Sequence, residues 1–205
     1  MNVLVGCEYT GIVTNALRAY NVQAFSCDIL ETEGNKAWHI KGDLIEVLHN
    51  NKWDAVIAFP PCTHLAVSGA KHFYKKKHLQ TEALEMVRTI LEYDCDYICL
   101  ENPVGIISTR ITKPTQYIQP YEYGNPQSKK TCLWLKGLPK LIPTKNVYND
   151  VEWQYFPSGK RMCKTYSQNK KDRDKTFKGI AYAMANQWHT YLQGKEQPKQ
   201  LTIPW

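Results

Sequence analysis

The amino-acid sequence predicts an α/β fold in which a largely parallel β-sheet is covered by helices on both faces. Short runs of apolar and β-branched residues alternate along the chain with segments of helical periodicity. The runs are apolar throughout, which is typical of strands buried on both sides of a parallel sheet. Ligands of such sheets bind beyond the carboxyl ends of the strands, so functional residues are expected directly after each run.

Each expected element follows from a local pattern. Strands are expected at residues 2–6, 22–27, 55–59, 97–100 and 131–135, where the runs are NVLVG, VQAFSC, AVIAF, YICL and TCLWL. Helices are expected at about residues 11–20, after a glycine turn, and at residues 78–93 and 176–192. The second helix shows apolar residues at helical spacing: Leu79, Ala83, Met86, Val87, Ile90 and Leu91. Residues 139–175 show no clear period and are expected to form long loops, and the tail from residue 194 is expected to be irregular.

Composition excludes several classes of protein. The chain has 205 residues, of which 43% are hydrophobic, so it can bury a core without disulfides. Its seven scattered cysteines are typical of a reducing compartment rather than a disulfide framework. There is no apolar run near the roughly 18 residues of a membrane span, and no signal-peptide pattern at the start. We therefore expect a cytoplasmic protein of a bacterium or of a phage-infected cell, without a membrane partner.

Positive charge is concentrated in one segment of the chain. Residues 129–178 hold 13 of the 26 lysines and arginines but four of the 19 acidic residues, a local net charge of +9 against −2 for the rest. Aromatic residues interleave with these basic residues, a pattern that favours a nucleic-acid-facing surface over an ordinary solvated one. The expected organisation is a core at 1–138, a basic, loop-rich, target-facing segment at 139–175, and a returning helix with a tail at 176–205.

Polar residues follow the first two expected strands. The turn Gly6-Cys7-Glu8-Tyr9-Thr10-Gly11 leads into a helix, and its glycines allow close approach of a ligand to the backbone. It lacks the lysine pattern of a P-loop. Asp28 follows the second strand, where a carboxylate can accept hydrogen bonds from ribose hydroxyls, and Asp43 lies where it can meet an adenine edge. Together these residues favour a cofactor that contains a nucleoside.

The next two strand ends carry reactive groups. Pro60 and Pro61 fix the backbone after the third strand and present Cys62, so this cysteine is a candidate nucleophile. Glu101 and Asn102 follow the buried strand at 97–100, where burial raises the pKa of a carboxyl group toward the range of a proton donor. A zinc set of Cys62 with His64, His72 and His78 lacks ligand spacing, so no metal site is expected.

These motifs, in this order, resemble the C5-cytosine DNA methyltransferase family, and most resemble its short, phage-type members. The most specific part is Pro60-Pro61-Cys62 followed about 40 residues later by Glu101-Asn102. The run Tyr123-Gly124-Asn125-Pro126-Gln127-Ser128-Lys129 is similar to that family's YGxPQxR segment. The likeness covers residues 2–137, and 172–190 more loosely. It implies a Rossmann-like sheet that binds S-adenosylmethionine, with a reduced target-recognition segment.

The resemblance also implies a role for each site residue. The thiolate of Cys62 would add to C6 of a flipped or unpaired cytosine while Glu101 stabilises charge at N3, and C5 would then take the methyl group. The implied catalytic residues are Cys62, Glu101, Asn102 and Lys129. The implied cofactor-binding residues are Gly6, Cys7, Glu8, Gly11, Asp28, Asp43 and Pro60. The implied nucleic-acid-binding residues are Gln127, Lys129, Lys160, Arg161 and Lys164, with Lys170 and Lys171 as further phosphate contacts.

Three features depart from the family pattern. Thr131 replaces the second arginine of the PQ segment, Ile180 replaces an expected asparagine after Gly179, and the recognition segment is short. DNA is the expected partner, and a partner subunit is an option for target recognition. Two alternatives stay open: C5 modification of another pyrimidine (in RNA, a nucleotide or a modified base), and a non-catalytic nucleic-acid-binding protein that retains the fold.

Overall fold

A seven-stranded β-sheet forms the centre of the molecule. The computed structural model describes residues 1–67, 77–164 and 175–194. The sheet has the order β3-β2-β1-β4-β5-β7-β6, in which β1 to β5 pair in parallel and β7 is antiparallel to both of its neighbours. The strands are β1 (Asn2–Gly6), β2 (Gln23–Asp28), β3 (His39–Lys41), β4 (Ala55–Ala58), β5 (Tyr97–Pro103), β6 (Gln116–Ile118) and β7 (Thr131–Lys136). The strand order reverses between β1 and β4, which opens a crevice at their carboxyl ends.

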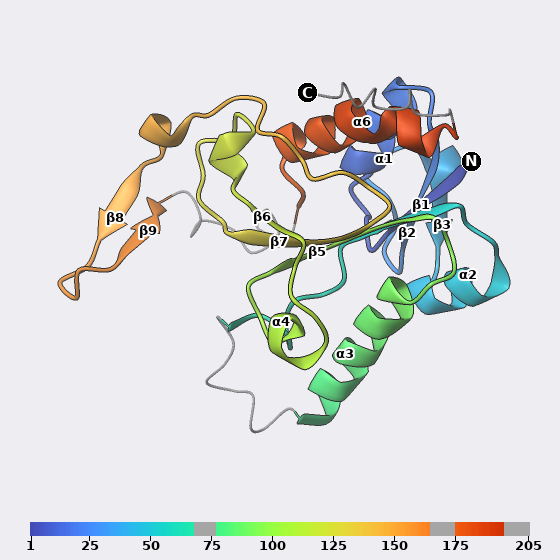
Figure 1. Cartoon of the computed structure of the whole chain (residues 1–205), viewed down its shortest axis with the longest axis horizontal. Helices are drawn as coiled ribbons and strands as arrows, with labels where there is room; N and C mark the ends of the chain where they lie inside the picture. The colour runs from blue at the N-terminus through green and yellow to red at the C-terminus, as the bar shows by residue number, and fades with distance from the viewer. Residues whose placement is uncertain (68–76, 165–174, 195–205) are drawn as a thin grey trace, which may run out of the picture.

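Helices cover both faces of the sheet (Figure 1). On one face lie α1 (Ile12–Ala19) and α6 (Lys178–Leu192), and on the other lie α2 (Leu44–Asn50), α3 (Lys77–Leu91) and α4 (Ile107–Arg110). Side chains of β1 alternate between the two layers, since Val3 and Val5 belong to the first core and Leu4 to the second. Because both faces are buried, the strands must be apolar at every position, as the sequence indicated.

The predicted α/β fold class is confirmed, with each expected strand and helix present within a few residues of its expected bounds. The strands β3 and β6 and the helices α2 and α4 were not predicted. Three 3₁₀ turns were also missed: Lys36–Trp38, Pro120–Glu122 and Tyr148–Asp150. Strands of three residues and a helix of four residues are too short to show a period. The helix α2 was identifiable from its start, because the Asp43 side chain accepts hydrogen bonds from the Ile45 and Glu46 N–H groups at 2.8 and 3.2 Å.

Residues 139–175 were expected to form long loops with little regular structure, and the described part contains one short hairpin that was not predicted. Strands β8 (Trp153–Tyr155) and β9 (Arg161–Cys163) form an antiparallel hairpin, closed by a turn in which Gly159 has φ 74°. Strands this short, with mixed polar and aromatic residues, give no readable alternation. Residues 165–174 and 195–205, including Lys170, Lys171 and most of the expected tail, lie outside the described residues. The division of the chain at residues 138 and 175 stays a prediction.

Membrane spans were also sought among the helices. Within residues 1–67, 77–164 and 175–194, none of the helices combines the length and the apolar character that a bilayer crossing requires.

The start of α6 packs directly on the backbone that precedes β7. The Gly179 N–H donates to the Asn125 Oδ1 at 3.2 Å, and a Cβ atom at position 179 would collide with the carbonyl oxygen of Tyr123. The absence of a side chain therefore lets α6 approach this turn closely and close one wall of the crevice described below.

The variant Gly179→Ala is expected to lower the free energy of unfolding by about 1–3 kcal/mol, because the collision outweighs the better helix propensity of alanine. Urea unfolding would measure the change. Gly42→Ala is the control, since a Cβ there has its nearest neighbour, Val47 Cγ2, at 3.9 Å. Equal stability of the Gly179→Ala and Gly42→Ala proteins would contradict the close approach.

Candidate active site

A cavity of about 500 Å³ lies at the carboxyl ends of the parallel strands. Its wall is formed by residues at or directly after the carboxyl ends of β1, β2, β3 and β4, by the last three residues of β5, by the start of β7, and by the segment that leads into α6. This is the crevice that the reversal of strand order between β1 and β4 creates. All four residues predicted to be catalytic line it: Cys62, Glu101, Asn102 and Lys129.

Cys62 lies on a loop that is hydrogen-bonded to the end of β5 and to the residues that follow this strand. We call residues 60–67 the Cys62 loop. The Asn102 Nδ2 donates to the Pro60 carbonyl at 2.8 Å, the Ile106 N–H donates to the Leu65 carbonyl at 2.9 Å, and the Val67 N–H donates to the Val104 carbonyl at 3.1 Å. A side chain at Gly105 would collide with the Leu65 carbonyl, so the two segments are in backbone contact. The thiol and the carboxyl group are therefore held in one wall.

Asn102 lines the cavity and also fastens the Cys62 loop. Its side chain is 1% exposed, and its Nδ2 holds the Pro60 carbonyl. Its Oδ1 is buried without a hydrogen-bond partner among the described residues. The geometry therefore makes Asn102 a residue that positions the Cys62 loop.

Glu101 is half-buried in the cavity wall, and burial raises the pKa of its carboxyl group above the usual value of 4.5. The positive charge of Lys129 and a hydrogen bond from the Thr131 hydroxyl act in the opposite direction. The Thr131 Oγ1 also lies 3.0 Å from the Lys129 carbonyl oxygen, to which it can donate. A hydroxyl has one proton, so at any moment Thr131 donates either to the Glu101 carboxylate or to the Lys129 carbonyl, and the bond to the carboxylate is the one that lowers the pKa of Glu101.

The other cysteines near the cavity are held as neutral thiols. All seven cysteines are described, and none forms a disulfide. Cys7 also lines the cavity, but burial, with smaller effects of Asp28, Cys27 and Asp43, raises its pKa to about 12. Burial likewise raises the pKa of Cys27 and of Cys132 to about 11. Because a thiolate is the nucleophilic form, this leaves Cys62 as the candidate nucleophile of the cavity.

The other end of the cavity has two carboxylates beside apolar side chains. Asp28 and Asp43 both line it, and each uses one oxygen to accept backbone N–H groups: Asp28 from Leu30 at 2.9 Å, and Asp43 from the start of α2. Ile29 and Leu30 are 67% and 53% exposed, unusually high for large apolar residues. Carboxylate oxygens beside exposed apolar side chains provide polar and stacking contacts for a nucleoside.

Three residues predicted to bind a cofactor do not line the cavity. Glu8 is 3% exposed, and its carboxyl group accepts hydrogen bonds from the Val13 and Thr14 N–H groups and from the Thr14 hydroxyl. Burial raises its pKa to about 7. Its role is to cap α1 from within the core. Gly6 makes room for Leu44, and Gly11, with φ 67°, packs against Gly34. These corrections leave Cys7, Asp28, Asp43 and Pro60 of the predicted cofactor set at the cavity.

The predicted nucleic-acid-binding residues occupy two places. Lys129 lines the cavity, and Gln127 is half-buried just before it in the chain. Lys160, Arg161 and Lys164 lie on or next to the β8–β9 hairpin.

Sequence reasoning missed the apolar part of the cavity wall. These residues include Tyr9, Ile29, Leu30, Leu44, Phe59, Met86, Ile118, Phe177 and Ile180. Ile29 and Leu30 could have been identified from the sequence. Two large apolar residues directly after the acidic residue that ends a strand would be exposed to solvent unless they lined a binding site. Phe177 and Ile180 were interpreted as core residues of the last helix, because helical spacing does not distinguish a core from a cavity wall.

A second recess, of about 730 Å³, shares no residue with the cavity. It is open and mainly polar, and Tyr121, Tyr148 and Asp150 are among its lining residues. It contains no nucleophile, so we place the candidate active site in the cavity beside Cys62.

The raised pKa of Glu101 has a consequence for stability that needs no substrate. From the carboxyl pKa of the unfolded chain up to the raised pKa of the folded protein, the folded protein holds a proton that the unfolded chain releases. Stability from this group is therefore lost as pH rises through that range. Glu101→Gln removes this loss. The free energy of unfolding of the variant, minus that of the unmodified protein, should therefore increase from pH 5 to pH 8, which means that the variant becomes relatively more stable.

Urea unfolding at several pH values would measure this difference. Glu85→Gln, which alters an exposed carboxylate on α3, is the matched control. A Glu101→Gln difference that stays constant with pH would show that the carboxyl group is not stabilised in its neutral form.

Comparisons with known proteins give similarity of fold without close relatives. No protein-family model matches the chain, and no curated protein matches its sequence. Among solved structures, similar chains include an E. coli prophage protein described as a DNA modification methyltransferase, with 14% identity and a TM-score of 0.41. They also include the Entamoeba histolytica methyltransferase EhMeth, with 17% identity and a TM-score of 0.48. The S. pombe Dnmt2 methyltransferase has 14% identity and a TM-score of 0.45.

The matched regions cover 71%, 71% and 68% of this chain, but 53%, 57% and 51% of those three structures. The chain thus spans about half the length of the solved structures it matches.

Proposed function

We propose that this protein transfers a methyl group from S-adenosylmethionine to C5 of a cytosine in DNA. The observation that carries the proposal is the shared cavity wall, to which the Cys62 loop contributes a thiol and the end of β5 contributes the half-buried carboxyl group of Glu101. The opposite end of the same cavity offers Asp28 and Asp43 to a nucleoside. A nucleophile, a proton donor and a nucleoside site in one cavity suit the activation of a pyrimidine ring.

The residues of the nucleoside end fit the proposed cofactor. The second oxygens of Asp28 and Asp43 are left for ribose hydroxyls and an adenine amino group, since the backbone hydrogen bonds from Leu30 and from the start of α2 use one oxygen of each. Apolar side chains such as Ile29 and Phe59 offer stacking surface to an adenine ring. When bound there, S-adenosylmethionine supplies an electrophilic methyl group.

In the proposed reaction, the Cys62 thiolate forms a bond to C6 of the cytosine. The electron pair displaced from the C5–C6 double bond makes C5 nucleophilic. Glu101 in its neutral form donates a hydrogen bond or a proton to N3, which stabilises the charge that develops in the ring. After C5 takes the methyl group, loss of the C5 proton and breakage of the Cys62–C6 bond restore the aromatic ring. The cytosine must be flipped out or unpaired, because the faces of a stacked base are not accessible.

Thr131 and Lys129 together support Glu101. The resemblance places a second arginine where this chain has Thr131, and the hydroxyl of Thr131 bonds the same carboxyl group that Lys129 influences by its charge. A hydroxyl adds no second positive charge to this site. Glu101 is thereby kept neutral to a higher pH than a carboxyl group with two adjacent cations would be.

The nucleophile is tested with a duplex that contains 5-fluorocytosine. Release of Cys62 requires loss of the proton at C5, and in 5-fluorocytosine this proton is replaced by fluorine. The protein should therefore remain joined to the base through Cys62 in the presence of S-adenosylmethionine. A gel-stable adduct, mapped to Cys62 by mass spectrometry, is the expected result. Cys62→Ser should give no adduct and reduce methyl transfer below detection, while its affinity for S-adenosylmethionine stays within a few-fold.

Methyl transfer by the Cys62→Ser protein would remove this thiol from the reaction. Labelled RNA or nucleotide without labelled DNA would change the substrate class and leave the chemistry in place. Cofactor binding with neither an adduct nor methyl transfer to DNA, RNA or nucleotide would favour a non-catalytic nucleic-acid-binding protein that retains the fold.

The hydroxyl of Thr131 is tested by the pH dependence of methyl transfer. The hydrogen bond of Thr131 lowers the pKa of Glu101, so Thr131→Val should raise it and move the high-pH fall of kcat/KM to higher pH. Thr131→Ser retains the hydroxyl and should restore the original profile. Identical profiles for all three proteins would show that Thr131 does not influence the proton donor.

A further inference from the structure

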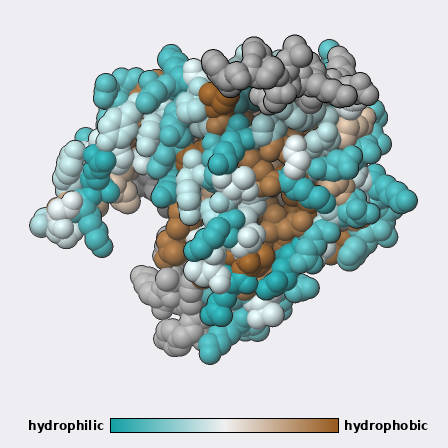
Figure 2. Space-filling model, viewed as in Figure 1, coloured by the Kyte–Doolittle hydropathy of each residue, from teal (hydrophilic) through white to brown (hydrophobic). Residues whose placement is uncertain are grey.

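The β8–β9 hairpin projects from the body of the molecule (Figure 1). The space-filling view shows it as a separate lobe with a hollow beneath it (Figure 2). Its two strands pair with each other and not with the central sheet. The tip of the hairpin is therefore accessible from several directions.

Aromatic packing anchors the base of the hairpin. The ring centroids of Tyr121 and Tyr148 lie 5.1 Å apart, and those of Tyr148 and Trp153 lie 6.0 Å apart. Cys163, opposite Trp153 in the hairpin, is 2% exposed. This chain of rings connects the hairpin to the 3₁₀ turn Pro120–Glu122, which lies between β6 and β7, and gives the projecting tip a fixed support.

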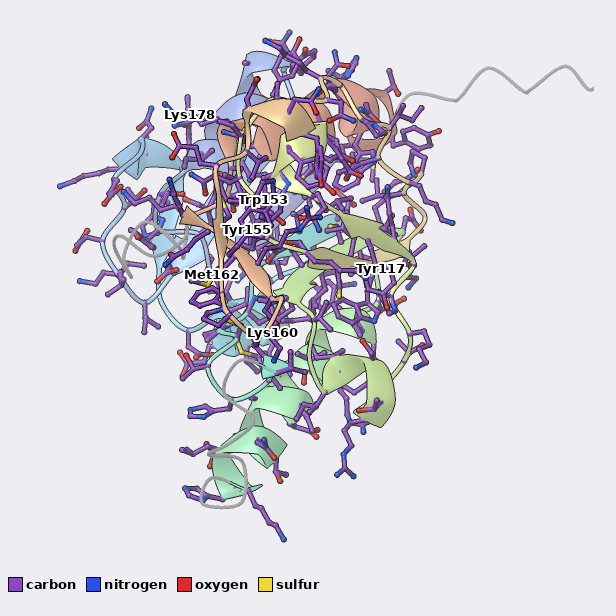
Figure 3. All side chains as sticks on the ribbon, turned by 90° about the vertical axis from the view of Figure 1, so that its left-hand side faces the viewer. Tyr117, Trp153, Tyr155, Lys160, Met162 and Lys178 are labelled. Atoms are coloured by element: carbon purple, nitrogen blue, oxygen red, sulfur yellow. The ribbon has the colours of Figure 1, made fainter. Side chains whose placement is uncertain are left out.

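The tip carries large apolar side chains that nothing in the described residues covers. Tyr155 is 68% exposed, Phe156 39% and Met162 38%. Tyr155 ends β8 and Met162 lies on β9, on the opposite face of the hairpin from Tyr155 (Figure 3). Phe156 follows Tyr155 directly, at the start of the turn. Neighbouring exposed apolar side chains such as Tyr155 and Phe156 mark a surface for binding.

Positive charge accompanies these side chains. Residues 153–163 contain Lys160 and Arg161 and no acidic residue. The guanidinium of Arg161 lies 4.2 Å from the ring centroid of Trp153 and hydrogen-bonds the hydroxyls of Tyr148 and Tyr155. Arg161 is thus held in place beside the exposed Tyr155 ring, which reduces the entropy lost when it meets an anion.

We propose that the hairpin tip is a stacking surface for unpaired bases of a nucleic-acid strand, with Tyr155 and Phe156 against the bases and Lys160 and Arg161 against the phosphates. Aromatic rings stack on bases and cations contact phosphates. A single strand offers bases and phosphates to a protein whatever its sequence. Binding to an apolar protein surface alone would not explain the basic residues. The inference deepens the proposed function, since it names the surface that would hold the strand around the target base.

The test is the binding of a single-stranded DNA oligonucleotide that contains 2-aminopurine, whose fluorescence falls when an aromatic ring stacks on it. The full chain is used, without cofactor. The double variant Tyr155→Ala/Phe156→Ala should bind at least about tenfold more weakly, as loss of base–aromatic stacking predicts, and should lose the fall in fluorescence. Because its cations are retained, the dependence of its affinity on salt should stay unchanged.

Two further variants separate stacking from charge. Lys160→Gln should reduce the slope of log affinity against log salt by about 1 and keep the fall in fluorescence. Tyr117→Ala is the matched control: this tyrosine is 49% exposed on β6 and lies 4.4 Å from the Lys130 ammonium, yet it is not part of the hairpin. It should bind like the unmodified protein.

Unchanged affinity of the double variant, or an equal loss in Tyr117→Ala, would overturn the inference. Both altered side chains are exposed, so circular dichroism should show an unchanged fold. Binding is measured without turnover, so the result does not depend on the methyl-transfer assay. Methyl transfer with normal binding of the double variant would refute the stacking surface alone, and loss of stacking without any methyl transfer would refute the proposed reaction alone.

Discussion

The contact of the Cys62 loop with the end of β5 and with residues 104–106 is the constraint on which the candidate active site depends. Parallel neighbours β4 and β5 end side by side, but pairing of the strands alone does not place the residues beyond their ends. The Asn102 side chain and the reciprocal backbone bonds of residues 65–67 with residues 104–106 supply that placement. Proline at positions 60 and 61 restricts the loop further, so little conformational freedom remains to be lost when the site is assembled.

Burial sets the chemistry of the groups held there. It raises the pKa of Glu101 and of Cys7 by the same cause, yet with different consequences. A neutral Glu101 gains the proton that a donor needs, whereas a neutral Cys7 loses nucleophilicity. Lys129 offsets part of the effect on Glu101. Burial in one cavity wall can therefore keep the Glu101 carboxyl group protonated and at the same time keep the Cys7 thiol neutral and unreactive.

The sequence predicted the parts of the molecule whose signals are local. Apolar runs located the long strands, and the strand ends located Cys62, Glu101, Asp28 and Asp43. Glu8 lies outside the cavity lining, and the sequence could not show this because its partners, Val13 and Thr14, become neighbours only when α1 has formed. The apolar wall from Phe177 and Ile180 depends on how α6 returns across the sheet, which helical periodicity cannot encode. The hairpin was missed because its strands are three residues long.

The charge of the basic segment serves more than one purpose in the folded chain. Lys175 lines the cavity and forms an ion pair with Glu33 at 2.9 Å, so it fastens the segment back to the core. Lys164 pairs with Glu152 at 3.8 Å at the base of the hairpin. Lys160 and Arg161 lie instead at the projecting tip, beside exposed rings. Strands of three residues present too few side chains to read several base edges. A stacking tip that favours unpaired bases would select a target by its accessibility, which is the property that the Cys62 reaction itself requires.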